Sequence, residues 1–418
     1  MHGPMLFRGC VFAFLLFAAA GTSAWAVTIP FVTVGDAGNA ADPLNSGTTP
    51  GIGAVAVEYR IAETEVTIGQ YAEFLNAIAA TDDVGLYNAN MGTDGDVAGV
   101  SRSGTNGSYT YAVIGTDDRP IAHASWLSAA RFVNWLHNGQ PSGVQDATST
   151  EDGAYDLSPP DPKDVVRKVG AVFFIPTLNE WYKAAYHQPA GDGGDADDYW
   201  LFATGSNASP DSDNPANLDA PDHSQVGNFY LNDGINNGYN GGFAVSGALT
   251  DGGDVLTPVG GYTLASSYYE TFDQGGSLYE MLETPKELLF PPGTAARAAV
   301  GGAWGSTAQM MASTNPLSVI SHGFGNNATG FRVASLVPSA IPFVQGTVDL
   351  IDNPAKDVEV EFVTQAVFEY ELQTGMNLVD WVVLETTTGN GQLFAHTHAG
   401  GWSGARRYYR VMRTELGP

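Results

Sequence analysis

The stretch Val300–Pro316 reads VGGAWGSTAQMMASTNP and bears most directly on the fold and chemistry of this chain. Its opening, VGGAW, predicts a strand that runs into a glycine pair. The twelve residues that follow include serine, threonine and two methionines but no cysteine. The stretch therefore raises the question whether this chain is an enzyme, and the answer depends on the segments around it.

Length and composition indicate a globular protein. The chain has 418 residues, of which 44% are hydrophobic and 11% aromatic, enough for one large domain and a smaller one. It also contains 51 glycines and many Asp/Asn/Ser clusters, such as PAGDGGDADD and LNDGINNGYNGG. These clusters between short apolar segments predict many loops and limited regular structure.

The first 26 residues have the pattern of a secretory signal peptide. Arg8 precedes an apolar run from Cys10 to Ala20, and Ala24-Trp25-Ala26 suits signal peptidase. The alternative is an uncleaved membrane anchor, but the run is shorter than the roughly 20 residues that span a bilayer. We therefore expect cleavage after residue 26 and a secreted protein, extracellular, periplasmic or at the cell surface, without a membrane span.

Cysteine usage limits the chemistry further. Cys10 is the only cysteine of the chain, and it lies within the predicted signal peptide. A mature chain that starts near Val27 then has no disulfides and no thiolate chemistry. Its stability must come from packing, backbone hydrogen bonds and bound ions.

Acidic residues greatly outnumber basic ones. The chain has 45 Asp and Glu against 17 Lys and Arg, a formal net charge of −28 at pH 7. Such a charge repels nucleic acid and anionic lipid surfaces at long range, which argues against both as partners. It is compatible with calcium held by oxygen ligands, although a solvated acidic surface explains it more simply.

Three segments have the apolar spacing of amphipathic helices. In TIGQYAEFLNAIAA the apolar face comprises Ile68, Tyr71, Leu75 and Ile78, and in SWLSAARFVNWLH Ser125 caps a stripe of Trp126, Ala129, Val133 and Leu136. The third, IPTLNEWYKAAY, places Thr177 three residues before Glu180, the spacing of a capping box, directly after an apolar strand predicted over Ala171–Ile175. We expect Trp181 and Ala185 to face inward.

The remaining periodic segments predict strands and a domain boundary. VVRKVGAVFFIP, YRIAETEVT and VGGAW are typical of strands, and GFRVASLV predicts a closing strand before the proline-containing stretch PSAIP. We expect a main domain over 27–337, a linker over 338–342 and a C-terminal module over 343–418. The module alternates apolar and polar residues between turn signals, which predicts a small antiparallel β structure.

Several of these segments together resemble the formylglycine-generating enzyme family, also called the sulfatase-modifying factor family. They occur in the family's order over about residues 31–335: YRIAETEVTIGQYAEFLNA, RPIAHASWLSAARFVNWL, FFIPTLNEWYKAAYH, TFDQGGSLYEM, VGGAWGS and GFRVAS. The resemblance implies an α+β, C-type-lectin-like fold that is compact but poor in regular structure.

Other stretches extend the resemblance to particular relatives. GDAGNAAD, LYNANM, HNGQP and TEDGAYDL look like paralogues found on secreted proteins of environmental bacteria. In the C-terminal part, NLVDWVVL and ARRYYRV are similar to short β-sandwich modules appended to secreted proteins of the same bacteria.

The resemblance also implies where catalysis would occur. Aerobic members of the family use two cysteine thiolates, five residues apart just after the glycine-pair strand, to hold Cu(I), bind the substrate cysteine and activate oxygen. Aligned without gaps, those positions here are Ser306 and Met311. A protonated hydroxyl does not replace a thiolate for a soft ion, and one thioether is a weak ligand. We therefore expect no copper and no catalytic residues of that kind.

Histidines do not suggest another metal centre. Relatives that form carbon–sulfur bonds use iron held by histidines, some from an extra helical domain that this chain lacks. No His-x-x-x-His pair occurs among the histidines of the main domain, which include His123, His137, His187, His223 and His322. His396 and His398 would share one face of a strand, but the pattern is too loose to predict a site.

Calcium is the cofactor that the resemblance favours, because the family fold carries structural calcium held by Asn and Glu side chains and backbone carbonyls. In FDQGGSLYEM, Glu280 falls on the family's acidic ligand and Ser277 stands where the family has Asn. In NPANLDAPD, Asn217 corresponds to a side-chain ligand and Leu218 to a carbonyl ligand, while Asp219 is either a further ligand or a turn residue.

Two functions follow from these observations. The first is a non-catalytic extracellular binding or structural module for a peptide, glycan or protein, with loop aromatics lining a groove or packing in the core: Tyr109, Tyr111, Tyr199, Trp200, Tyr268 and Tyr269. The second is an oxidoreductase of the formylglycine-generating type that modifies a protein cysteine through an unrecognised cofactor. The missing cysteines favour the first.

Overall fold

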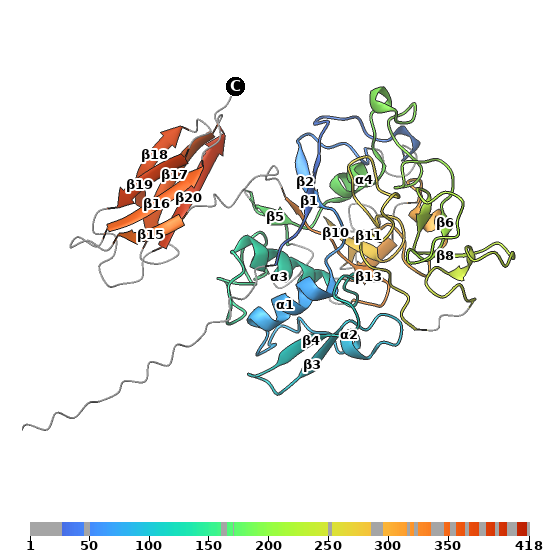
Figure 1. Cartoon of the computed structure of the whole chain (residues 1–418), viewed down its shortest axis with the longest axis horizontal. Coiled ribbons are helices and arrows are strands. Elements are labelled where there is room, and N and C mark those ends of the chain that lie inside the picture. The colour runs from blue at the N-terminus through green and yellow to red at the C-terminus, as the bar shows by residue number, and fades with distance from the viewer. Residues whose placement is uncertain are drawn as a thin grey trace, which may run out of the picture.

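A computed structural model describes most of the chain from Val27 onward. The described residues are 27–45, 51–159, 165–169, 171–249, 253–285, 296–315, 318–321, 325–335, 347–351, 357–363, 368–375, 382–388, 393–398 and 408–415. The predicted signal peptide 1–26, the predicted linker 338–342 and His322 lie outside the described residues. The described part has the predicted α+β architecture, with few helices and several small sheets (Figure 1).

The three predicted helices form, and the caps predicted at Ser125 and Thr177 are present. They are α1 (Ile68–Ile78), α3 (Trp126–His137) and α4 (Leu178–Tyr186), and a short α2 spans Asn90–Thr93. Thr67 and Thr177 each form a capping box, and the Ser125 side chain accepts a hydrogen bond from the Ser128 backbone N–H. Among the described residues there are also three short 3-10 turns: η1 (Pro43–Asn45), η3 (Ala190–Asp192) and η5 (Ala308–Met311).

The largest core lies where α1 and α3 pack together (Figure 1). Phe74 of α1 meets Phe132 of α3 edge-on with ring centroids 5.3 Å apart, and Phe331 packs edge-on against Phe132 at 5.5 Å. Edge-to-face pairs of this kind add to the free energy gained by burial. Because Phe331 comes from the GFRVAS segment, this core joins the two ends of the main domain.

A four-stranded antiparallel sheet adjoins this core. Its order is β1 (Phe31–Val34), β2 (Tyr59–Ala62), β14 (Ala334–Ser335) and β5 (Phe173–Phe174). The strands are shorter than the sequence predicts. In particular β2 ends at Ala62, since a bend at Glu63 and Thr64 takes the chain out of the sheet.

A second four-stranded sheet carries the stretch around Val300. Its order is β12 (Ser318–Ser321), β11 (Ala296–Val300), β10 (Tyr279–Pro285) and β13 (Thr329–Gly330). The strand predicted over VGGAW is only partly present, because β11 ends at Val300. Gly301 and Gly302 have φ angles of 93° and 76°, in the left-handed region that favours glycine, and they turn the chain out of the sheet.

The remaining strands form small antiparallel or paired units. Three two-stranded ladders join β3 (Val100–Ser103) to β4 (Thr110–Val113), β6 (Asp211–Ser212) to β7 (Val226–Gly227) and β8 (Tyr230–Asn232) to β9 (Gly241–Phe243). The C-terminal residues form two antiparallel three-stranded sheets, as predicted: β15 (Thr347–Ile351), β16 (Asp357–Val363) and β19 (Leu393–His398), and β18 (Val382–Thr388), β17 (Phe368–Gly375) and β20 (Tyr408–Glu415). None of the helices in the described ranges has the length and apolar character needed to cross a membrane.

Candidate functional site

The two positions that correspond to the family's cysteines lie together around Gly302. A methyl group placed on Gly302 would sit 2.9 Å from the Cγ atom of Met311 and 3.5 Å from the Cβ atom of Ser306. The turn at Gly302 and the 3-10 turn η5 therefore bring both side chains to the same point. Ser306 and Met311 thus both approach Gly302, and neither of them supplies a thiolate.

Ser306 has its hydroxyl engaged in local hydrogen bonds. The Oγ atom accepts a hydrogen bond from the Ala303 backbone N–H (2.9 Å) and donates one to the Tyr279 hydroxyl (3.2 Å). These partners include no histidine or carboxylate that would remove the proton, so the described residues give Ser306 no activation as a nucleophile.

Met311 is part of the hydrophobic interior. Its side chain is 2% exposed and packs in a cluster with Phe202, Phe229 and Ala312, while its carbonyl oxygen accepts a hydrogen bond from the Tyr186 hydroxyl (2.9 Å). The flexible thioether fills the apolar space between these side chains. Together with a hard, protonated hydroxyl at Ser306, this donor set does not fit Cu(I), which is selected by soft sulfur ligands.

Glu280, one of the predicted calcium ligands, lies in a buried ion pair. Both of its carboxylate oxygens bind the guanidinium of Arg332, at 2.6 and 2.7 Å, and one of them also accepts a hydrogen bond from the Trp181 indole N–H (2.8 Å). Glu280 is 1% exposed and Arg332 is fully buried. These contacts satisfy most of the hydrogen-bonding capacity of the carboxylate.

The other predicted calcium ligands lie in two turns. Ser277 is buried with φ of 58°, and its carbonyl oxygen accepts a hydrogen bond from the Trp304 backbone N–H (2.8 Å). Asn217 is exposed and Leu218 half-buried, and the Asn217 amide contacts the Asp219 carboxylate at 3.4 Å. Within the described ranges no three His, Cys, Asp or Glu side chains are grouped to hold a metal ion. Calcium binding stays a prediction.

Two further carboxyl groups that sequence reasoning missed, those of buried Glu65 and half-buried Asp273, interact electrostatically with the Glu280–Arg332 pair. Glu65 is 1% exposed, and neither of its carboxylate oxygens has a hydrogen-bond partner. Burial raises the pKa of Glu65 well above its usual value, and Asp273 and Glu280 raise it further. Burial likewise raises the pKa of Asp273 to about 6. An arginine inside the apolar run GFRVAS was the available signal, since a charge in such a run needs a buried partner.

Three of the described histidines are engaged in separate contacts, whereas His223 is exposed. His123 faces Asp94 (Nε2 to Oδ2, 2.9 Å), and Nδ1 of His137 accepts a hydrogen bond from the Val172 backbone N–H (3.1 Å). His187 is 2% exposed and its Nδ1 atom is hydrogen-bonded to the Tyr269 hydroxyl at 2.8 Å. Each of these three histidines thus belongs to its own local network.

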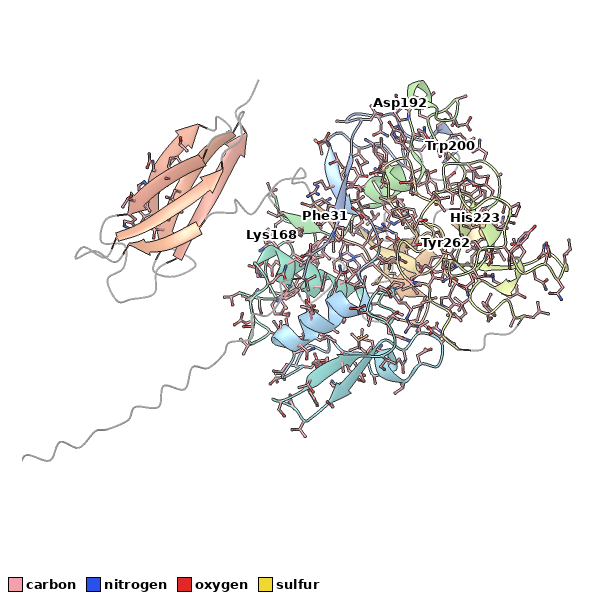
Figure 2. All side chains as sticks on the ribbon, in the orientation of Figure 1. Phe31, Lys168, Asp192, Trp200, His223 and Tyr262 are labelled. Atoms are coloured by element: carbon pink, nitrogen blue, oxygen red, sulfur yellow. The ribbon has the colours of Figure 1, made fainter. Side chains whose placement is uncertain are left out.

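The loop aromatics named from the sequence divide into core and surface residues. Tyr111, Tyr199 and Tyr269 are almost fully buried. Trp200 is half-buried and its indole N–H donates to the Gln188 side chain (2.8 Å), whereas Tyr268 is 40% exposed. Figure 2 shows Trp200 among the side chains of the main domain. The packing interpretation therefore holds for most of the set, and Tyr268 is the clearest surface residue.

The fold has few helices and several small sheets, as in proteins of the sulfatase-modifying type, and Ser306 and Met311 lie where the resemblance predicts the paired thiolates. A family model for the Sulfatase-modifying factor enzyme 1-like domain matches residues 31–337. This chain belongs to that family.

Solved structures resemble the chain at low sequence identity. The structure titled CarF is 18% identical, with a TM-score of 0.42, and the match covers 74% of this chain and 99% of that one. Treponema denticola variable protein 1 is 16% identical, with a TM-score of 0.42 and coverages of 73% and 95%. PvdO from Pseudomonas aeruginosa is 14% identical, with a TM-score of 0.37 and coverages of 74% and 92%. No curated protein sequence matches the chain.

Proposed function

We propose that this chain is a secreted, non-catalytic member of the sulfatase-modifying factor family that acts as an extracellular binding or structural module. The donor set around Gly302 carries the proposal. Ser306 offers a protonated, hydrogen-bonded hydroxyl and Met311 a buried thioether, where copper-dependent oxidation in the family relies on two thiolates. The signal-like sequence of residues 1–26 supports secretion.

A direct assay of formylglycine formation tests the non-catalytic role. The purified mature chain is incubated with Cu(I), oxygen and a cysteine-containing peptide that carries the sulfatase motif, and the peptide is analysed by mass spectrometry. We expect no mass loss beyond that in a reaction with the metal alone. Conversion above this background would show that the chain is an oxidoreductase with an unrecognised cofactor, and the proposed function would be wrong.

Structural calcium is the second part of the proposal. The resemblance assigns the ligands to Asn217, Leu218, Ser277 and Glu280, and oxygen donors of this kind suit calcium. The test is elemental analysis of the purified chain together with thermal unfolding in the presence and absence of a chelator. Bound calcium and a lower melting temperature with chelator are expected. If no calcium is retained and the melting temperature does not move, these ligands are wrong.

A further inference from the structure

An open groove runs between strand β1 and the loop 268–270 of the main domain. Phe31 and Thr33 line it from β1, Glu63 from the segment after β2, and the run Tyr268–Glu270 from the opposite side. No lysine, arginine or histidine lines the groove among the described residues. It therefore combines aromatic side chains with negative charge and has no basic residue of its own.

From this composition we infer that the groove binds a basic peptide segment, taking a lysine or arginine side chain between the Glu63 and Glu270 carboxylates and against the Tyr268 ring. The inference names the ligand class of the proposed binding module and rests on that proposed function.

The two carboxylates are available for a ligand. Neither Glu63 nor Glu270 makes an ion pair or a side-chain hydrogen bond with any other described residue. Glu270 is exposed and Glu63 half-buried. A cation is the ligand that this charge favours, because neutral groups would leave both carboxylates without a counter-charge.

The aromatic side of the groove suits the same ligand. Arg60 does not line the groove, but its Cζ atom is 5.0 Å from the centroid of Phe31, a cation–π distance, so this ring already has a cationic partner. Tyr268, with 40% of its surface exposed, offers a second ring at the opposite side. Figure 2 labels Phe31 on β1 and Asp192, whose carboxylate accepts a hydrogen bond from the Tyr268 hydroxyl (3.0 Å).

The loop that presents Tyr268 and Glu270 is held in place from several directions. The Ser267 backbone N–H donates to the Thr271 carbonyl (2.9 Å), and the Phe272 N–H donates to the Glu63 carbonyl (2.8 Å), which fixes the loop beside Glu63. From the interior, the Tyr269 hydroxyl is hydrogen-bonded to buried His187. The groove is thus formed before a ligand arrives, and less conformational entropy is lost on binding.

Calorimetric titration with a capped pentalysine peptide tests the inference on the mature chain. The matched probe is the same peptide with every lysine acetylated, and the buffer contains 0.15 M salt, at which attraction by distant surface charges is largely screened. The double variant Glu63→Gln/Glu270→Gln removes the groove charges. Its control, Glu73→Gln/Asp118→Asn, removes the same charge from exposed positions outside the groove.

We expect the lysine peptide to bind and its acetylated form not to bind. Loss of two ion pairs should weaken binding about tenfold in the groove variant and less than about twofold in the control. Tyr268→Ala should weaken binding further, and circular dichroism checks that each variant is folded. Equal losses in both double variants, equal binding of the acetylated peptide, or absence of binding would each overturn the inference. The formylglycine assay separately decides the proposed function.

Discussion

Replacement of Arg332 tests whether the Glu280 network holds the main domain together. The guanidinium is fully buried and makes five hydrogen bonds: two to the Glu280 carboxylate and one each to the carbonyl oxygens of Ala62 (3.0 Å), Glu63 (3.1 Å) and Phe272 (2.8 Å). Arg332→Met keeps a long apolar side chain but removes every one of these donors. It leaves Glu280 buried, with the Trp181 indole N–H as its remaining partner.

The expected loss of stability is large for one substitution. Removal of one partner from a buried ion pair costs about 3–5 kcal/mol, because the other charge is left without compensation. The carbonyl groups of Ala62, Glu63 and Phe272 each lose a donor as well, although the Glu63 carbonyl keeps the Phe272 N–H, so we expect a loss of about 4 kcal/mol or more. A domain of ordinary stability, about 5–15 kcal/mol, would then be only marginally folded.

Urea unfolding followed by tryptophan fluorescence measures the effect. The matched control is Arg131→Met, since Arg131 binds Glu151 through two hydrogen bonds (2.7 and 2.8 Å) but both side chains are partly exposed. Such a pair contributes about 1 kcal/mol or less. If Arg332→Met does not fold, the milder Glu280→Gln, which keeps an amide oxygen for Arg332, should still be measurably less stable than the control. Equal losses at Arg332 and Arg131 would refute the reasoning.

Two further predictions concern the carboxyl group of Asp273 and the pair of positions Ser306 and Met311. Because the pKa of Asp273 is raised to about 6 in the folded state, its contribution to stability is present below pH 4 and is lost as pH rises through 6. The unfolding free energy of Asp273→Asn minus that of the parent chain should therefore rise by about 3 kcal/mol between pH 4 and pH 7. If urea unfolding gives the same difference at both pH values, the prediction is wrong. Since Ser306 and Met311 both approach Gly302, the double variant Ser306→Cys/Met311→Cys should bind Cu(I) in competition with a chromogenic chelator, whereas either single variant should bind it far more weakly. Equal binding by single and double variants would show that the two positions do not form one site.

The helices were predictable from the sequence because local rules decide them. Apolar spacing and the Thr177–Glu180 capping box placed α4 within a residue or two of its observed bounds. The strands were less predictable. Strand bounds depend on where a partner strand ends and where the backbone bends, as at Glu63 and at Gly301, and these features depend on contacts between distant segments.

In the candidate site, too, the features set by local sequence were predictable, and those set by contacts between distant segments were not. The sequence and its resemblance identified Ser306 and Met311, which the structure brings together at Gly302. Sequence reasoning named Glu280 as a calcium ligand from the resemblance alone, and no contact of the structure tests that prediction. It missed that Arg332, 52 positions later in the chain, and Trp181 bind the same carboxylate. A role shared by residues from three elements is visible only when the fold brings them together.

The contacts of Ser306 and Met311 explain how the fold persists without the family's thiolates. The Ser306 hydroxyl satisfies the Ala303 backbone N–H, and Met311 fills an apolar cluster with Phe202, so neither substitution leaves a cavity or an unpaired polar group in its place. The ion pair of Glu280 and Arg332, by contrast, connects backbone carbonyls from separate segments of the domain. The residues that hold this fold together are therefore distinct from Ser306 and Met311, the two positions at which the resemblance predicts the copper ligands.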